Sequence, residues 1–385
     1  MAHLTPTPAT LRRLQRIARQ RGLTLVELMV ALIVGLMVIM AAMSVFSTTS
    51  RSAGTVDAVG QLRDDARFAA DIIQRLAVQT GFEDIGFVTR TYQGTPQTYQ
   101  SINGLVDPTK MMAPISGFSG KKPEDGPFSL DGDKQLTFDP GDDAPGGSDT
   151  LILRYQPVNK GSEDVGGTDG SMITCTGTAA GDAHSTDIRT DRTVSIFYVD
   201  DIDGEPTLYC RYADRENGTL TSLGSPQPLV KGVESFKVLY GVDNIEPNAA
   251  VDCNGTSSNC TTEHAKLVPT RFLTAEQMTV AGDIPATETN WRRVRALRIG
   301  IVLRSGNLPI QRGQAASDPT IYPLGEGFGG EYVPNSGDGD ARLRQEYTFT
   351  VNIRNCLNQG YQSAGDPGRA AASNIPPCDV IVPRT

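Results

Sequence analysis

The sequence predicts an α+β protein in which one long N-terminal helix, apolar and then amphipathic, packs on a β-rich, mainly antiparallel domain. Residues 28–46 contain no charge, and strand-like patterns recur after residue 148 while helical patterns become rare. The 40 Gly and 24 Pro among 385 residues favour many turns around a moderate core. We therefore divide the chain into five segments: 1–22, a basic leader; 23–46, a transmembrane helix; 47–81, its amphipathic continuation; 82–147, an irregular connection; and 148–385, a β-rich domain.

The leader and the apolar run predict a single membrane crossing. Five arginines and no acidic residue precede Gly22. Positive charges beside an apolar segment stay on the cytoplasmic side. As a helix with a rise of about 1.5 Å per residue, residues 23–46 would span about 36 Å, enough to cross a bilayer. The chain after residue 46 is therefore expected on the far side of that membrane.

Two alternatives compete for this N-terminal region. A general secretory signal peptide is cut after its apolar core at small residues, but residues 47–50, Ser-Thr-Thr-Ser, contain no Ala-x-Ala site. A plain membrane anchor stays open on composition alone. Glu27 bears on the choice, because an ionisable residue at the start of an apolar helix costs a few kcal/mol in lipid, by order of magnitude. Either it has a function, or its carboxylate simply lies among the headgroups.

Residues 22–28, Gly-Leu-Thr-Leu-Val-Glu-Leu, resemble the processing site of type IV prepilins and pseudopilins. Leu23 departs from the Phe that is commonest at the first mature position. The resemblance implies that a prepilin peptidase cuts after Gly22 and methylates the new amine of Leu23. Glu27 then lies one helical turn from that amine. In a filament of packed helices its carboxylate could neutralise the amine of a neighbouring subunit, since an unpaired buried charge is strongly unfavourable.

The amphipathic continuation has an apolar stripe at three- and four-residue steps and a charged opposite face. We expect the stripe to pack against the domain, and Gly81 to end the helix in a left-handed conformation. The stripe consists of Val59, Leu62, Ala66, Ala69, Ile73 and Leu76; the opposite face carries Arg63, Asp64, Arg67, Asp71 and Arg75.

Beyond residue 81, the segment 82–147 reads as irregular, with one possible strand at 135–138. Later segments alternate apolar and polar residues or are β-branched, which predicts strands of a sheet with one wet face. One short helix is expected near 274–278. The expected strands are 150–155, 193–199, 207–212, 235–240, 294–304 and 347–354.

All six cysteines follow the apolar run, and their even number predicts disulfides on the oxidising side of a membrane. Zinc is the alternative, but no Cys-x-x-Cys pair exists. Six cysteines allow 15 pairings. We predict sequential pairing, and Cys253 with Cys260 is the best supported because turn-forming residues separate them. The three predicted pairs are Cys175–Cys210, Cys253–Cys260 and Cys356–Cys378.

Charge and residue types argue against two other functions. Without the leader, 30 basic residues face 44 acidic ones, a net charge of −14 that disfavours nucleic acid as a direct partner. An enzyme is not predicted, because His184 and His264 lie in polar loops without evident catalytic neighbours. Residues 200–204, Asp-Asp-Ile-Asp-Gly, lack the order of a calcium loop and predict a turn between strands. No catalytic residue, metal site or cofactor is therefore expected.

Several later segments, taken in order, resemble the PilW family of minor pilins: residues 66–69, 81–82, 148–155, 233–243, 291–305 and 347–355. The resemblance implies a low-abundance subunit that helps to prime type IV pilus assembly near the tip. Its partners would be prepilin peptidase, the other minor pilins, the major pilin and a large tip adhesin. It would sit in the inner membrane of a Gram-negative bacterium, with a periplasmic domain, before entering the extracellular pilus. A type II secretion pseudopilin and a pilus-borne adhesive binding module stay open as alternatives.

Overall fold

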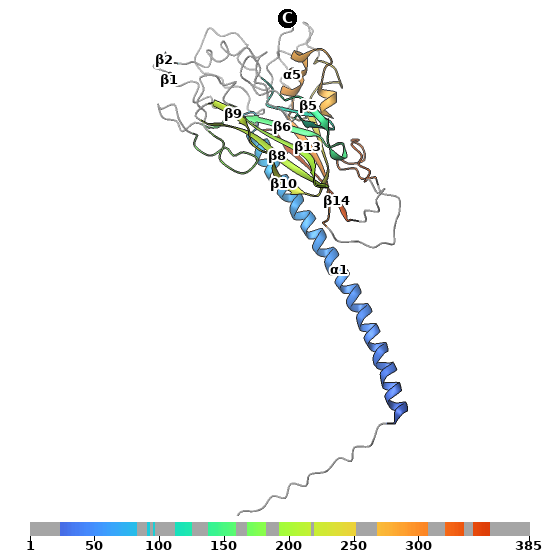
Figure 1. Cartoon of the computed structure of the whole chain (residues 1–385). Helices are drawn as coiled ribbons and strands as arrows, with labels where there is room; N and C mark the ends of the chain where they lie inside the picture. The colour runs from blue at the N-terminus through green and yellow to red at the C-terminus, as the bar shows by residue number, and fades with distance from the viewer. Residues whose placement is uncertain are drawn as a thin grey trace, which may run out of the picture. The chain divides into compact units, whose positions relative to one another are not determined.

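The structure is a computed structural model that describes residues 24–82, 91–92, 95–96, 112–124, 138–158, 168–181, 192–216, 219–251, 268–306, 320–334 and 342–354. The chain divides into two units, residues 1–56 and 57–385. The boundary falls inside the first helix, so each part of that helix is described with its own unit. Figure 1 shows the chain from its N-terminal helix to the strands of the body.

Helix α1 runs from Leu25 to Gln79, and its first part belongs to the N-terminal unit. Every large apolar side chain between residues 25 and 46 is exposed. Among the described residues this is the one helix long and apolar enough to cross a membrane, and its most apolar 18-residue stretch has no buried residue. The predicted apolar helix is therefore present, and its large apolar side chains are exposed in the described part of the chain.

The second part of α1 is amphipathic, as predicted. Its inward stripe is buried, and Ile73 and Leu76 have no exposed surface. Gly81 follows the helix with a φ of 74°, the left-handed conformation expected of a glycine that ends a helix. Its amide donates to the Arg154 carbonyl at 2.9 Å, so the end of the helix is bonded to a strand of the body. The buried stripe consists of Ala58, Leu62, Ala66, Ala69, Ala70, Ile73, Leu76 and Ala77.

Two antiparallel sheets form most of the body. The six-stranded sheet has the order β10-β8-β7-β6-β3, with β9 also paired to β8. The four-stranded sheet has the order β12-β11-β13-β14. Their bounds are β3 Ile115–Phe118, β6 Thr150–Tyr155, β7 Thr193–Ile202, β8 Glu205–Glu216, β9 Thr219–Leu223, β10 Gln227–Lys231, β11 Val233–Val242, β12 Arg271–Leu273, β13 Ala296–Arg304 and β14 Arg344–Asn352.

Short elements complete the described body. Two further strand pairs and three short helices lie outside the main sheets. They are β1 Thr91–Tyr92 with β2 Thr95–Pro96, β4 Lys121–Pro123 with β5 Pro140–Asp143, the 3-10 helix η2 Pro145–Gly147, α4 Ala275–Met278 and α5 Ile284–Arg292. Helix α4 confirms the short helix expected near residues 274–278, and the Thr274 side chain caps its first turn.

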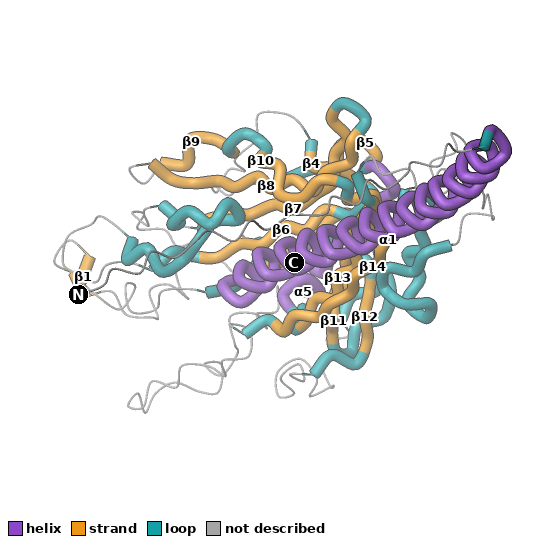
Figure 2. The backbone as a smooth tube through the Cα atoms, turned by 90° about the horizontal axis from the view of Figure 1, so that it is seen from below, coloured by secondary structure: helices purple, strands orange, loops and turns teal. Residues whose placement is uncertain are grey.

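One hydrophobic core joins the second part of α1 to both sheets. Ile73 and Leu76 of the helix share a cluster with Leu153 of β6, Phe236 of β11 and Ile301 of β13. Figure 2 shows the two sheets on either side of the line of this helix. A second, smaller cluster covers the opposite face of the six-stranded sheet, around Ile196 and Tyr198. The α+β class and the antiparallel sheets are therefore confirmed.

Ser148 and Asp149 connect the two sheets just before β6. The Asp149 amide donates to the Phe236 carbonyl at 2.7 Å, and the Val238 amide donates to Asp149 Oδ2 at 2.9 Å. The Ser148 hydroxyl accepts from the Phe236 amide at 3.1 Å. This two-residue segment therefore satisfies the edge of β11 that faces away from β13, and it bonds the start of one sheet to the other.

The prediction of an irregular segment at 82–147 was incomplete. Strand β3 belongs to the six-stranded sheet, and β4 pairs with β5. Residues 135–137 of the possible strand lie outside the described residues, and Phe138 precedes β5 as a buried side chain. The body therefore begins well before residue 148, in contrast to the predicted division. Strands β9, β10 and β12 and helix α5 were also not predicted.

The outer face of the four-stranded sheet is less exposed than alternation suggested. Residues 320–334 lie across it: Arg298 Nε donates to the Leu324 carbonyl at 3.0 Å. Thr348 Oγ1 donates to the Pro323 carbonyl at 2.5 Å. Gly300 is required beneath this segment, because a Cβ there would lie 2.2 Å from the Pro323 oxygen. The expectation of one fully wet face was wrong where this segment covers the sheet.

Candidate assembly site on the N-terminal helix

Glu27 lies in the first turn of α1, where its carboxylate bonds to Thr24. The Thr24 amide and the Thr24 hydroxyl both donate to Glu27 Oε2 at 3.0 Å. The Glu27 amide lies 3.3 Å from Thr24 Oγ1 and donates to it. This reciprocal pair is a capping box, in which two side chains satisfy amides that the first turn leaves free. Glu27 therefore fixes the start of its own helix.

The capping box also fixes where the Glu27 charge lies. Its carboxylate oxygen is at hydrogen-bonding distance from the amide of Thr24, the residue that follows Leu23. A negative charge at this end is favourable, because a helix N-terminus carries a partial positive charge. Gly22 and Leu23, the predicted processing residues, lie outside the described residues. The structure thus places the Glu27 carboxylate against Thr24, the first described residue of the chain.

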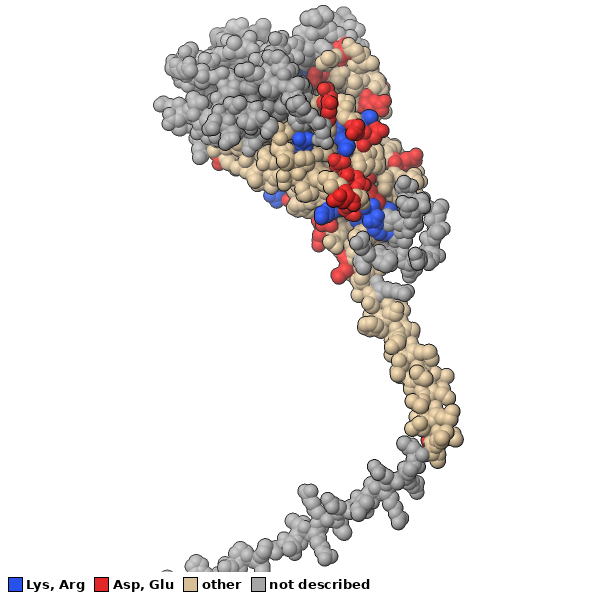
Figure 3. Space-filling model, in the orientation of Figure 1, with Lys and Arg blue, Asp and Glu red and all other residues tan. Residues whose placement is uncertain are grey.

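Beyond Glu27, the helix offers one continuous apolar surface. Leu32, Leu36 and Ile39 are each more than half exposed, and no charged residue interrupts residues 28–46. In Figure 3 this part of the chain is an unbroken uncharged surface. An exposed apolar patch of this extent indicates a membrane or protein contact. Its chemistry suits lipid or the apolar helices of other chains.

The second part of α1 presents a charged outer face. Asp71 and Arg75 form an i,i+4 ion pair at 2.8 Å, with both side chains more than half exposed. Such surface pairs contribute little to stability, about 0.3–0.5 kcal/mol. Phe68 stands out on this face because half of its surface is exposed. The outer face is therefore suited to water and to polar neighbours, in contrast to residues 28–46.

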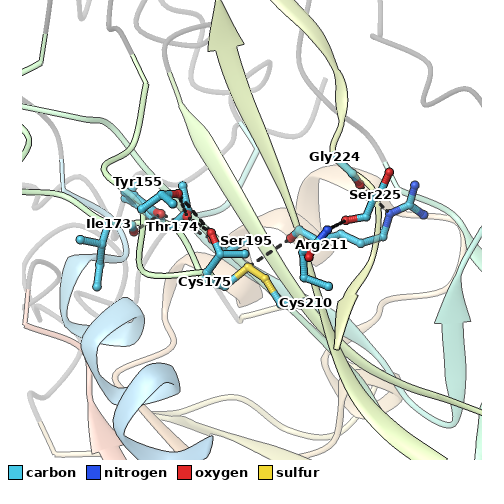
Figure 4. The surroundings of a disulfide bond; sticks show 12 residues. Tyr155, Ile173, Thr174, Cys175, Ser195, Cys210, Arg211, Gly224 and Ser225 are labelled. Atoms are coloured by element: carbon cyan, nitrogen blue, oxygen red, sulfur yellow. Dashed lines mark hydrogen bonds between the residues drawn. A yellow bond between two sulfur atoms is a disulfide. The ribbon is translucent and has the colours of Figure 1, made fainter. Parts of the chain in front are cut away.

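The disulfide predicted between Cys175 and Cys210 is present, with the two Cα atoms 6.2 Å apart. It joins the segment 168–181 to β8, and both cysteines are fully buried (Figure 4). Beside it, the Tyr155 hydroxyl donates to the Ile173 carbonyl at 2.5 Å. The Ile173 amide in turn donates to the side chain of Gln79 at 2.8 Å. The disulfide therefore holds a segment that bonds directly to the last residue of α1.

A partly buried ion network joins the sheets at their other end. Arg344 donates to both carboxylate oxygens of Glu234, at 2.6 and 3.0 Å. Arg304 bonds to Glu205 at 2.9 Å and to the Gly204 carbonyl in the β7–β8 turn. Burial, and then the nearby Glu234 carboxylate, raise the pKa of Tyr332 to about 12. The network joins the β7–β8 turn of one sheet to β11, β13 and β14 of the other, so its role is to stabilise the fold.

Some of the remaining predicted residues lie outside the described part of the chain and others lie within it. Cys253, Cys260, Cys356, Cys378, His184 and His264 lie outside the described residues, so two of the three disulfide predictions stay predictions. The turn predicted within residues 200–204 is present but shorter: β7 continues to Ile202, and Asp203 and Gly204, both with positive φ, form the turn. Within the described part of the chain, no group of three His, Cys, Asp or Glu side chains could hold a metal ion. Thr24 was missed as a capping residue, although Thr-x-x-Glu before an apolar run is its signature.

Two family models match parts of the chain. Residues 17–43 match the prokaryotic N-terminal methylation motif. Residues 196–355 match the family model of the type IV pilus-assembly protein W, PilW. A type IV-like pilin from Thermus thermophilus is similar at 16% identity over 55% of this chain and 80% of that one, with a TM-score of 0.24. The search of curated proteins found no match.

The methylation motif and the exposed apolar helix support the class of type IV pilins for this chain. Within that class, the match over residues 196–355 supports similarity to PilW. Pilins are structural subunits that are processed by a prepilin peptidase and contact other pilins. The motif and the apolar helix fit a membrane-anchored protein that enters a pilus.

Proposed function

We propose that this chain is a minor pilin that primes type IV pilus assembly together with other minor pilins and a large tip adhesin. A prepilin peptidase would cut after Gly22 and methylate Leu23. Before assembly, the chain would be anchored in the inner membrane of a Gram-negative bacterium, with its body in the periplasm. After assembly it would lie near the tip of the extracellular pilus, so that its function is structural and not enzymatic.

The observation that carries this proposal is Glu27 at the head of an otherwise uncharged, exposed helix. A plain anchor needs no carboxylate there, since any charge within lipid is costly. In a bundle of such helices, the methylated amine of one subunit supplies a positive charge that the Glu27 carboxylate of another can neutralise. Pairing then sets the axial position of each subunit, because a shifted subunit would leave both charges unpaired in an apolar surrounding.

The capping box orients the Glu27 carboxylate before this pairing takes place. Thr24 holds the Glu27 carboxylate towards the N-terminus of α1. The distance from the Thr24 amide nitrogen to Glu27 Oε2 is 3.0 Å. The carboxylate is thus already oriented when a second helix arrives, which lowers the entropy lost on contact. Pre-orientation by Thr24 supports a role in assembly beyond a role in anchoring.

The proposal is tested first by deletion of the chain, scored for surface pili and for type II exoprotein secretion in the same strain. We expect pili and twitching to be lost while secretion continues. Loss of secretion with normal pili would instead identify a pseudopilin. A purified chain that binds a surface ligand without the other pilins would point to an adhesive module.

Processing is tested separately with Gly22→Val. The peptidase requires a small residue before the cut, so the variant should accumulate with its leader still attached. Mass spectrometry of the N-terminal peptide reads the outcome, and Gly35→Val in the same helix is the matched control, because a Cβ at that position meets no atom within 4 Å beyond its chain neighbours and the local helix backbone. Normal cleavage of the Gly22→Val chain would refute the proposed site.

A further inference from the structure

The segment 320–334, which crosses the outer face of the four-stranded sheet, turns at residues 325–331, here named the Phe328 loop. At the base of this segment, Ile321 and Tyr332 exchange two backbone hydrogen bonds of 2.8 Å. At the turn, the Phe328 amide donates to the Gly325 carbonyl at 3.1 Å. The Phe328 side chain is 43% exposed, and outside α1 it is the most exposed phenylalanine among the described residues. The loop therefore presents an aromatic ring at the surface of the body.

Side chains of the sheet hold the Phe328 ring in place. The guanidinium carbon of Arg298 is 4.3 Å from the ring centroid, a cation–π contact. The Phe272 ring meets it edge-on, with the two centroids 6.0 Å apart and the two planes at 89°. Arg298 is itself fixed by its bond to the Leu324 carbonyl. Because the exposed ring is already held in one position, little side-chain entropy is lost when a partner covers it.

Two carboxylates flank the exposed ring and have no cation of their own. Glu326 and Glu331 are both exposed, and neither forms an ion pair within the described part of the chain. The segment 320–334 contains no Lys or Arg. Two cations beneath it are engaged with backbone carbonyls, Arg298 with Leu324 and Lys237 with Gly147. The charges of Glu326 and Glu331 therefore stay available to a cationic partner.

We propose that the Phe328 loop is the contact by which this chain binds another subunit of the pilus tip. The partner surface would be an apolar pocket for the Phe328 ring, with Lys or Arg side chains at its rim. Interfaces place aromatic anchors at their centre and charges at their rim, where opposite charges steer association. This inference rests on the proposed function, because it takes its partner from the same assembly.

The charge of the chain argues against a second copy as that partner. The chain carries a net charge of −9, and the segment 320–334 has two carboxylates and no basic residue. Two such loops brought together would repel each other, since like charges across an interface disfavour association. A different subunit with basic residues is therefore the occupant that the chemistry fits.

Photo-crosslinking in piliated cells tests the contact directly, with p-benzoylphenylalanine in place of Phe328. We expect a crosslinked peptide from another pilus subunit, identified by mass spectrometry, with Lys or Arg beside the crosslinked residue. The same probe in place of Ile202 is the matched control, because Ile202 is 51% exposed and lies among Asp200, Asp201 and Asp203. A crosslink to a second copy, the absence of any crosslink to a pilus subunit, or equal yields at positions 328 and 202 would each overturn the proposal.

Substitutions in the loop separate this contact from the proposed function. Phe328→Ala should lower the amount of this chain in sheared pili roughly tenfold, and Phe328→Tyr, which keeps the ring, should restore it. Glu326→Lys combined with Glu331→Lys leaves the ring untouched and should lower it as well, because a basic rim would now be repelled. Ile202→Ala should be recovered normally, and each variant should keep its leader cleavage and its urea midpoint.

The deletion strain distinguishes the two ways in which the account can fail. If deletion of the chain abolishes pili but the Phe328→Ala and double Glu→Lys chains enter pili at the wild-type level, the loop contact is refuted and the proposed function stands. If deletion leaves pili intact, the proposed function fails, and this inference, which rests on it, fails with it.

Discussion

The two parts of α1 show how one helix is built for two surroundings. Between residues 25 and 46 every large apolar side chain is exposed, whereas between residues 57 and 79 the apolar stripe is buried in the body. Residues 28–46 are apolar all round, and the later part is apolar on one face only. The difference teaches that the second part packs into the body and stabilises it, whereas the first part leaves its apolar side chains exposed among the residues that the structure describes.

The largest expected effect compares the same substitution in each part. Leu76→Ala should lower the free energy of unfolding of the body by about 3 kcal/mol, because Leu76 is fully buried and the change leaves a cavity. Leu36→Ala, at a leucine that is 58% exposed, should change it by less than about 0.5 kcal/mol. Urea unfolding of the full chain in detergent measures both. Equal losses would show that the two parts do not differ as described.

Loss of the Cys175–Cys210 disulfide should speed amide exchange in the second part of α1 and leave it unchanged in the first part. Replacing Cys175 and Cys210 together by Ala should cost about 3 kcal/mol, since the bond closes a long loop in the unfolded chain. The segment bonded to Gln79 is then released, so amide exchange in residues 73–79 should become faster. Exchange in residues 28–46 serves as the internal control. An unchanged rate at residues 73–79 would mean that this segment does not hold the helix end.

A smaller effect is expected from Asp149, which makes the stability of the body depend on pH. Burial raises the pKa of Asp149 above its usual 3.8, although Lys237 and the amides of Val238 and Gly120 oppose the shift. As the pH rises above 3.8, the Asp149 carboxyl group therefore stays protonated to a higher pH in the folded chain than in the unfolded chain. The stability contributed by Asp149 falls as the pH rises through its folded-state pKa.

Asp149→Asn isolates that contribution. The difference in unfolding free energy, wild type minus variant, should decrease from pH 3.8 upwards and become constant above the folded-state pKa. Urea unfolding at a series of pH values measures it, and the exposed Asp71→Asn change is the control. A difference that grows with pH would show that the folded state favours the carboxylate.

Much of this fold could be predicted because the relevant signals are local. Periodicity located both parts of α1, runs of apolar and β-branched residues located β6, β7 and β8, and alternation located β11, β13 and β14. Strand β3 escaped because Gly117 weakens a strand pattern. The reason for that glycine is long-range: a Cβ there would lie 2.1 Å from the Tyr240 hydroxyl and 2.3 Å from the Thr150 carbonyl. No local pattern contains those neighbours.

Helix α5 and the capping role of Thr24 were not predicted, although the sequence contains signals for both. Helix α5 begins with Asp283 as its cap and proline in its first turn, but Thr287 and Thr289 weaken its helical pattern. Thr24 was read only as part of the processing site, although it caps the helix together with Glu27. Glu27 was named as the candidate assembly residue from its residue type and position, and the orientation of its carboxylate needed the structure.

The most direct test of the account is the amount of this chain in sheared pili when Glu27 is changed. Glu27→Ala should be cleaved normally but recovered in filaments at a small fraction of the wild-type level, and Asp71→Ala, at an exposed carboxylate of the same helix, should be recovered normally. Glu27→Gln keeps a side chain that can cap the helix but has no charge, so it should fail like Glu27→Ala. Recovery of both Glu27 variants at the wild-type level would contradict the proposal that this carboxylate pairs with a neighbouring amine during assembly.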